Sequence, residues 1–330
     1  MKFNLWSSPF DGRRRVALGF AALALAGLGL PSRAQNRRPL RFVVPLPPGS
    51  GVDTIARLVA MKVGEYTSQP AIVENKPGAS GFLAVQAVLG APADGHTVLV
   101  VGNSTLTINP VAFKRLPYDP AADFVPLKLF GGGYCLLIVP AASPYAKLSD
   151  LVADARSRPG ALNYASGTTT YELYTEMFNQ QAQIKTTRIP FKGTADAVNG
   201  IASATVDFAV VDGTAAYELV RSGRVRALAF TGPSRSPVLP QVPTASESGF
   251  PKFDAFVWVA AFVSSKTKPE QVQQLRELFA RAHESTELQK FYARTGTVQS
   301  GLAPEQIQQF ILDEMGRMKT LAAAAGLQPE

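Results

Sequence analysis

The alternation of short apolar runs with amphipathic runs constrains the fold of this chain more than any other feature of its sequence. From residue 40 onward, strand-like segments such as "RFVVPL", "AIVEN" and "HTVLVVGN" are separated by segments of helical periodicity such as "DTIARLVAMKVGEY" and "GFLAVQAVLG". Continuous apolar strands between amphipathic helices predict an α/β fold, in which a mostly parallel sheet is covered by helices on both faces.

The alternation restarts after the runs "FVPLKLF" and "CLLIVP", and four more helix–strand repeats follow, ending at "RVRALAF". We therefore predict two lobes, formed by residues 35–138 with 262–330 and by residues 139–261. Strands near 135–140 and 256–264 are expected to cross between the lobes, and the helical segments from Pro269 on are expected to pack on the first lobe. Such a hinged molecule can close around a ligand in its cleft.

The first 34 residues have the pattern of a secretory signal peptide. Arg13, Arg14 and Arg15 precede an apolar run over residues 16–30, and the small residues Ser32 and Ala34 predict cleavage near Ala34. The apolar run is shorter than the roughly 20 residues of a membrane-spanning helix, so a retained anchor is the weaker interpretation. The arginine cluster leaves export by the twin-arginine route open beside the general route.

Charge and cysteine content argue against several classes of protein. The chain carries a formal charge of +8, but its first 34 residues hold five Lys or Arg and one Asp, which leaves +4 for the remainder. Because that remainder has no run of five or six basic residues, nucleic acid is not an expected partner, and its mild positive charge favours small anions. The single cysteine, Cys135, cannot form an intrachain disulfide and is expected to be a buried apolar residue.

The loop "PLPPGSGVD" between the first strand and the first helix is a candidate anion site, and residues 45–52 are called the first loop below. Ser50 can cap the helix, with Asp53 at capping-box spacing. Gly49 and Gly51 allow a ligand to approach the backbone N–H groups, and the helix dipole favours an anion there. A plain strand-to-helix turn remains the alternative. Neither phosphate-binding glycine motif, G-x-x-x-x-G-K-[ST] or G-x-G-x-x-G, occurs here.

A second helix start of the same kind occurs in the other predicted lobe, at "ASGTTTYEL". Ser166, Gly167, Thr168 and Thr169, called the second loop below, gather small and hydroxyl-bearing residues between a strand and a helix. Thr169 and Glu172 have capping-box spacing, so simple capping is the alternative to ligand binding. One such start in each lobe favours an anion site in the cleft more strongly than either start alone.

Two further strand ends carry polar residues. Asn103, Ser104 and Thr105 follow one apolar strand, where a turn-and-cap role is equally open. Asp212 ends another strand, where it can cap the next helix, the interpretation we favour, or accept a hydrogen bond from a ligand amine or hydroxyl.

Enzyme chemistry has little support in the sequence. The two histidines, His96 and His283, are not part of a metal or nucleophile motif; His96 opens a strand, and His283 is expected near a helix end, where a cation suits the dipole. No cofactor and no metal are expected. A hydrolase using the same cleft would need an activated nucleophile, for which no histidine is evidently placed.

Several motifs together resemble the tripartite tricarboxylate transporter substrate-binding family, also called the Bug family. They are "VENKPGASG", "LPYDP", "LNYASGTT" and "IPFKGTADAVNGIASATVDFAVVDG", and the resemblance extends over essentially the whole chain after residue 34. It implies a two-lobed periplasmic binding protein type II fold. It also implies that the protein delivers a small organic acid to membrane transporter subunits. A sensor receptor without a transport role is the alternative that the sequence leaves open.

The resemblance also implies which residues hold the acid, a mono-, di- or tricarboxylate that could be aromatic or an amino acid. Its carboxylate would be held by the two loops, with the strand ends completing the cleft wall. The residues implied are Gly49, Ser50, Gly51, Val52, Ser166, Gly167, Thr168, Thr169, Asn103, Ser104, Thr105 and Asp212. Leu46 and Ser50 depart from the Pro-Phe-Pro-Pro-Gly-Gly form common in the family, so both are expected to influence the choice of ligand.

Overall fold

The computed structural model of the protein describes residues 38–324 and 326–329. The predicted signal peptide, residues 1–34, lies outside the described residues. Within the described part of the chain, no helix combines the length and the apolar character that a membrane span requires.

Ten strands form one sheet with two halves that share the long strand β4 (Phe124–Pro140). In the first half, β1 pairs in parallel with β2 and β3, while β9 is antiparallel to β3 and β4. The short β10 pairs with the other edge of β4. The bounds of these strands are β1 Leu40–Val44, β2 Ala71–Asn75, β3 Thr97–Gly102, β9 Phe256–Ser264 and β10 Val298–Gln299.

The second half has the same plan. Here β5 pairs in parallel with β6 and β7, while β4 is antiparallel to β7 on one side and to β8 on the other. The bounds are β5 Asn163–Ser166, β6 Thr187–Pro190, β7 Phe208–Asp212 and β8 Val225–Phe230. The prediction of parallel strands is therefore confirmed within each half, and the antiparallel pairs involve the strands that connect or border the halves.

The connection between the halves is continuous along β4. The sequence predicts two separate strands in this region, but the structure has one strand of 17 residues. It pairs with β9 as far as Tyr134 and with β7 from Cys135 onward. The chain returns to the first half through β9. The lobe boundaries predicted at 138/139 and 261/262 remain predictions.

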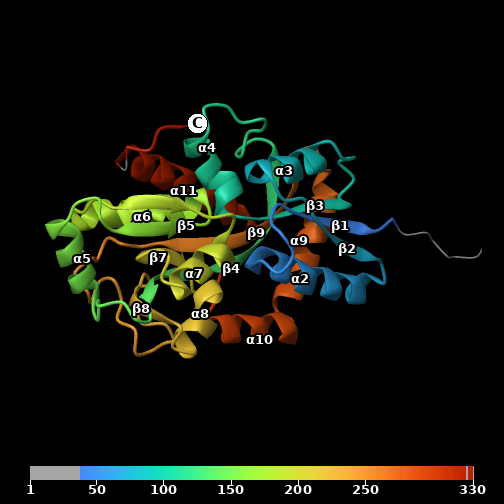
Figure 1. Cartoon of the computed structure of the whole chain (residues 1–330). Helices are drawn as coiled ribbons and strands as arrows, with labels where there is room; N and C mark the ends of the chain where they lie inside the picture. Colours follow the sequence, from blue (N-terminus) through green and yellow to red (C-terminus); the bar gives the residue numbers. More distant parts are fainter. Residues whose placement is uncertain (1–37, 325, 330) are drawn as a thin grey trace, which may run out of the picture. The chain divides into compact units, whose positions relative to one another are not determined.

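Helices cover both faces of each half, as expected for this pattern of strands. Figure 1 shows α5 and α6 at one end of the described chain and α2, α3 and β2 at the other. The longer helices are α2 (Gly51–Thr67), α3 (Phe82–Leu89), α5 (Leu148–Ser157), α6 (Thr169–Ala182), α7 (Thr194–Ala202), α8 (Gly213–Arg221), α9 (Pro269–His283), α10 (Thr286–Thr295) and α11 (Pro304–Ala324). Three short turns were not predicted: η1 (Ala79–Gly81), η2 (Ser104–Ile108) and α4 (Asn109–Ala112).

Four apolar cores correspond to the four faces of the two halves. In the first half, α2, α9 and α10 pack on one face, and α3 with the start of α11 packs on the other. In the second half, α5 and α6 pack on one face, and α7 and α8 on the other. Because burial of apolar surface is the main stabilising term in folding, these cores stabilise a chain whose only cysteine, Cys135, is fully buried and unpaired.

The last helix, α11, differs from the expectation that the C-terminal helices pack on the first lobe. Its residues Ile307 and Ile311 belong to a core of the first half, as expected. Its residues Met318 and Ala322, however, are buried in the core that α5 and α6 form with the second half. The helix therefore contributes side chains to both halves.

The imidazole of His283 also differs from expectation. It is buried at the end of α9, where its Nδ1 atom lies 3.0 Å from the hydroxyl oxygen of Tyr292. Burial, with the neighbouring Lys128 charge, lowers the pKa of His283 to about 4. The side chain is therefore neutral near pH 7 and does not act as the expected cation at a helix end.

Where β4 passes from one half of the sheet to the other, the space around Gly132 requires a residue without a side chain, and this requirement can be tested. A Cβ atom on Gly132 would lie 2.1 Å from the carbonyl oxygen of Val257, whereas one on Gly133 would meet nothing within 4 Å. We expect Gly132→Ala to lower the free energy of unfolding by about 2–3 kcal/mol, because the clash is with backbone. Gly133→Ala is the matched control and should change it by less than about 1 kcal/mol. Urea unfolding of both variants checks this; equal stabilities would contradict the packing described for β4.

Candidate functional site

The first loop enters α2 through the cap that the sequence predicts. Ser50 is the N-cap residue, and its side-chain oxygen accepts a hydrogen bond from the Asp53 N–H at 3.2 Å. Gly49 has a φ of +86°, a conformation that glycine adopts without strain. Leu46 is half-buried and packs against the core beneath α2.

The buried Asp53 carboxylate holds the first loop in its conformation through hydrogen bonds. Its side chain is only 2% exposed, and its Oδ2 atom accepts hydrogen bonds of 2.9 Å from the Gly49 N–H and from Arg57 Nε. Asn75, at the end of β2, donates to Asp53 Oδ1 at 2.8 Å and to the Leu46 carbonyl at 2.9 Å. The capping-box bond thus reaches Gly49 instead of Ser50, and the carboxylate links the loop to the neighbouring strand.

The pKa of Asp53 reflects this environment. Burial by itself would raise the pKa, but the hydrogen bonds from Arg57, Gly49 and Asn75 outweigh it and hold the pKa below its usual value. The carboxylate is therefore charged at neutral pH. The Gly49 N–H is occupied by it, whereas the N–H groups of Gly51 and Val52 have no acceptor within residues 38–324 and 326–329.

The second loop begins α6 one residue earlier than the sequence suggests. Thr168, not Thr169, is the N-cap residue, so the capping box that the spacing of Thr169 and Glu172 allowed does not form. Glu172 instead forms an ion pair with Arg188 at 2.9 Å. Thr169 is the first helical residue, so its N–H group points out of the helix start without an intrahelical acceptor.

One hydroxyl in the second loop lacks a hydrogen bond. Ser166 Oγ donates to the Thr168 carbonyl at 3.0 Å, but Thr168 Oγ1 is buried and has no partner in the described part of the chain. An unbonded buried hydroxyl is costly, so such groups are often completed by a ligand or by water. Gly167 is in close contact with Gly193, where an added Cβ atom would lie 2.5 Å from the Gly193 carbonyl carbon.

Asp212 caps α8, which is the role we favoured from the sequence. Its Oδ1 atom accepts from the Ala215 N–H at 3.1 Å and from the Thr214 hydroxyl, and its Oδ2 atom accepts from the Tyr171 hydroxyl at 2.7 Å. Tyr171 lies in the first turn of α6, so this bond joins the start of α6 to the start of α8. Both carboxylate oxygens are thus engaged, and any ligand contact by Asp212 would be an additional one.

The starts of α2 and α8 also adjoin each other, although they belong to different halves of the sheet. A Cβ atom added to Gly51 would lie 3.9 Å from Thr214 Oγ1. Together with the Tyr171–Asp212 bond, this contact brings the first loop, the start of α6 and the start of α8 into one region. The free donors named above for this region, within the described part of the chain, are neutral: backbone N–H groups and the Thr168 hydroxyl.

The strand end after β3 continues into helical structure, whereas the sequence left a turn-and-cap role and a ligand role equally open. Residues 104–108 form a turn of π-helix, a feature often found at functional sites. Asn103 is 4% exposed and donates to the Tyr174 hydroxyl at 3.1 Å, which connects β3 to α6 across the two halves. Ser104 is half-buried, and Thr105 is buried with its carbonyl accepting from Tyr118.

A further segment, which was not predicted to take part in the site, borders the same region. Residues 78–81 all have positive φ, including the two non-glycine residues Ala79 and Ser80. A Cβ atom on Gly81 would lie 3.0 Å from Thr105 Oγ1 and 3.2 Å from Pro45 Cβ. The signal available in the sequence was the "PGASG" motif, with two glycines flanking small residues.

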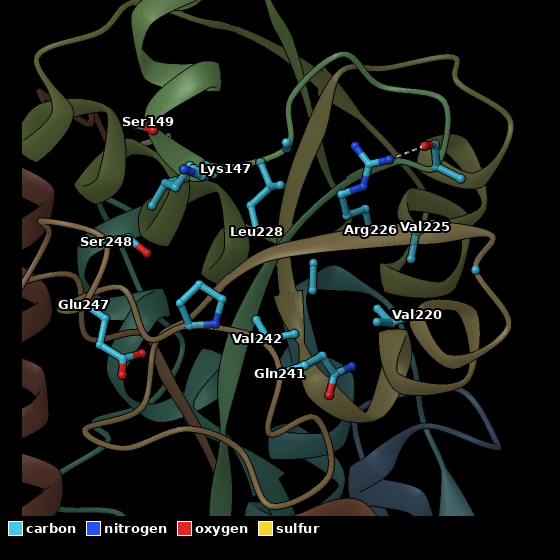
Figure 2. Close-up of a pocket in the computed structure, with 16 residues that line it drawn as sticks. Lys147, Ser149, Val220, Val225, Arg226, Leu228, Gln241, Val242, Glu247 and Ser248 are labelled. Atoms are coloured by element: carbon cyan, nitrogen blue, oxygen red, sulfur yellow. Dashed lines mark hydrogen bonds between the residues drawn. The ribbon is translucent and has the colours of Figure 1, made fainter.

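A separate pocket has none of the thirteen predicted residues in its lining. It has a volume of about 800 Å³ and is lined by the start of α5, by β8 and by residues 241–248 (Figure 2). Within residues 38–324 and 326–329, no three His, Cys, Asp or Glu side chains gather as a metal site would require.

Comparison with known proteins identifies the family of the chain. The sequence model of the "Tripartite tricarboxylate transporter family receptor" matches residues 55–327. Protein BugT of Bordetella pertussis is 30% identical over 92% of this chain and 95% of its own length. A protein from the tcbD-tcbE intergenic region of Pseudomonas sp. is 33% identical over 94% of both chains.

Solved structures agree with this result. An R. palustris protein determined with adipate superposes with a TM-score of 0.83 at 29% identity, covering 89% of this chain and 99% of that one. MatC from Rhodopseudomonas palustris with bound malate gives a TM-score of 0.79 at 29% identity, covering 86% and 98%. The expected two-lobed type II fold is thereby confirmed. The chain belongs to the tripartite tricarboxylate transporter receptor family, which consists of periplasmic solute-binding receptors and not of enzymes.

Proposed function

We propose that this protein is an exported receptor that binds a small organic carboxylate between the two halves of its sheet and delivers it to membrane transporter subunits. The observation that carries the proposal is the set of unbonded donors at the helix starts: the N–H groups of Gly51 and Val52, and the buried Thr168 hydroxyl. The adipate and malate bound by two structural relatives support a carboxylate as the ligand.

Binding by these groups would rest on hydrogen bonds and helix dipoles, not on an ion pair. Hydrogen bonds to a charged group contribute about 1.5–3 kcal/mol each, and a helix dipole about 0.3–2 kcal/mol. Arg57, the first basic residue after the first loop, is engaged with Asp53 and Asn75. Its role in this proposal is to hold the loop in shape while the neutral donors contact the ligand.

The remaining predicted residues would form the walls of the same cleft. Ser104 and Thr105 would border it beside the second loop, to which Ser166 belongs, and Asp212 would accept a hydrogen bond from a ligand hydroxyl or amine. Leu46 would act through packing, because its side chain meets the core beneath α2. Export would use the signal peptide, with cleavage near Ala34.

The function is tested by a thermal-shift screen against mono-, di- and tricarboxylates, including adipate and malate, with uncharged amides of the same acids as controls. A true ligand at a hundred times its Kd should stabilise the protein by about 2.7 kcal/mol, because only the folded state binds it. The amides should give no shift. If no carboxylate in the panel stabilises the protein, the proposal of a carboxylate receptor is wrong.

The Thr168 hydroxyl is expected to contribute to affinity without contributing to the stability of the free protein. Thr168→Val keeps the shape of the side chain and removes an oxygen that has no partner in the described structure. We expect calorimetric affinity for the ligand from the screen to fall about tenfold, and free-protein stability to stay constant or rise slightly. Thr320→Val, exposed on α11, is the control. Unchanged affinity would remove Thr168 from the site.

Asp53 is expected to stabilise the first loop only while it is charged. Because its folded-state pKa is lowered, the stabilisation is present above about pH 4 and is lost as the pH falls through the lowered value. Asp53→Asn should therefore be less stable than the wild type at pH 7, and the difference should shrink below about pH 4. Urea unfolding at pH 7, 4 and 3 measures this, with Asp313→Asn as the control. A difference that is the same at every pH would contradict the role given to the charge.

A further inference from the structure

The second half of the sheet has an edge that is only partly covered. β8 pairs with β4 along one side. On its other side, only its last residue is paired: the Phe230 N–H donates to the Pro243 carbonyl at 2.9 Å, and the Ala245 N–H donates to the Phe230 carbonyl at 2.7 Å. This contact is a parallel bridge with Thr244, so the edge already accepts a parallel neighbour at one end.

The 800 Å³ pocket is a groove along the uncovered part of this edge. Its floor includes residues 225–228 of β8. Lys147 and Leu148, at the start of α5, line it from one face of the sheet, and Val220 and Gly223, at the end of α8, line it from the other. Figure 2 shows Lys147 and Glu247 toward one end of the groove and Val220 and Val225 toward the other. A groove bordered by both helix layers follows the line that a further strand would take.

An open strand edge of this kind is a template for strand addition. Its unpaired backbone N–H and C=O groups can bind an extended peptide, while alternate side chains of the peptide enter the pocket beside the strand. The strand is also irregular at Leu228, where the register with β4 shifts between Leu137 and Ile138. Such bulges are common at sheet edges.

The charges around the groove favour an acidic occupant. Lys147 and Arg226 line the groove, and Arg224 lies between the lining residues Gly223 and Val225. Lys147 and Arg224 are exposed and have no ion pair within the described residues, and Arg226 donates only to the carbonyls of Ala141, Ser143 and Tyr145.

The nearby carboxylates are already engaged. Glu247 pairs with Arg235 at 2.9 Å, Glu218 pairs with Arg221 at 3.0 Å, and Asp150 accepts from the N–H groups at the start of its own helix. The uncompensated charge of the groove is therefore positive.

We propose that this groove is a docking site for an acidic, extended segment of a partner protein, which adds to the sheet as a strand beside β8. The site is distinct from the helix starts assigned to the ligand and does not depend on that assignment. Charge complementarity would select the partner and speed association, and the backbone bonds along β8 would hold it.

The test begins with a random dodecapeptide library displayed on phage and selected on the full chain. Enriched peptides should contain Asp or Glu alternating with apolar residues. A fluorescent synthetic copy of the enriched peptide should bind the wild type, and hydrogen exchange should slow within residues 225–229 when it is bound.

Charge reversal provides the matched comparison. The double variant Lys147→Glu/Arg224→Glu should weaken peptide binding by about tenfold or more, because two attractions become repulsions. The control Lys290→Glu/Lys319→Glu carries the same change of charge on exposed positions of α10 and α11 and should bind as the wild type does. Circular dichroism of both variants confirms that each is folded.

Several outcomes would overturn the proposal. They are the absence of any enriched peptide, enrichment of neutral or basic peptides, protection outside β8, and equal affinity for the reversed and control variants. Sedimentation velocity of the chain alone tests one further outcome, a dimer that the Lys147→Glu/Arg224→Glu variant abolishes. Such a dimer would assign the groove to a second copy of this chain and would overturn the proposal.

Discussion

A single continuous strand, β4, is the constraint on which the rest of the structure depends. It pairs with β9 up to Tyr134 and with β7 and β8 from there on, so both halves of the sheet are aligned along one backbone. The crossing passes through a run of three glycines, two of which have no space for a side chain. The position of each half, and therefore of the helix starts above it, follows from the course of this strand.

In the candidate site, the groups proposed to contact a ligand are different from the groups that maintain the shape of the loops. In the first loop, the charged network of Asp53, Arg57 and Asn75 fixes the backbone, while uncharged N–H groups remain free at the helix start. In the second half, the Tyr171–Asp212 bond does the same for the starts of α6 and α8. If this is the binding site, small changes in its walls would suffice to change the acid that is bound, because most of the proposed donors come from the backbone.

Most helices and strands could be predicted because the spacing of apolar residues along each segment reflects which of its side chains are buried. The four apolar cores confirm that these side chains are buried. The cap at Ser50 was predictable for the same reason, since capping involves residues three apart. The choice of Thr168 over Thr169 as the N-cap was not predictable, because both residues suit it and the close contact of Gly167 with Gly193 comes from another element. The links of Asp53 to Asn75 and of Asn103 to Tyr174 join residues far apart in the sequence, so no local pattern shows them. The groove beside β8 was equally hidden, since it depends on which strand lies at the edge.

The dual packing of α11 has a mechanical consequence. Ile307 and Ile311 are anchored in one half, Met318 and Ala322 in the other, and the Arg317 guanidinium bonds the Asp254 carbonyl just before β9 begins. The C-terminal helix thus connects the two halves of the sheet through its side-chain packing. In a receptor that opens to exchange its solute, the bending stiffness of this helix adds to that of β4 and β9, the two strands that connect the halves. When the halves move apart, the helix must either bend or withdraw one of its ends from the core in which it is buried.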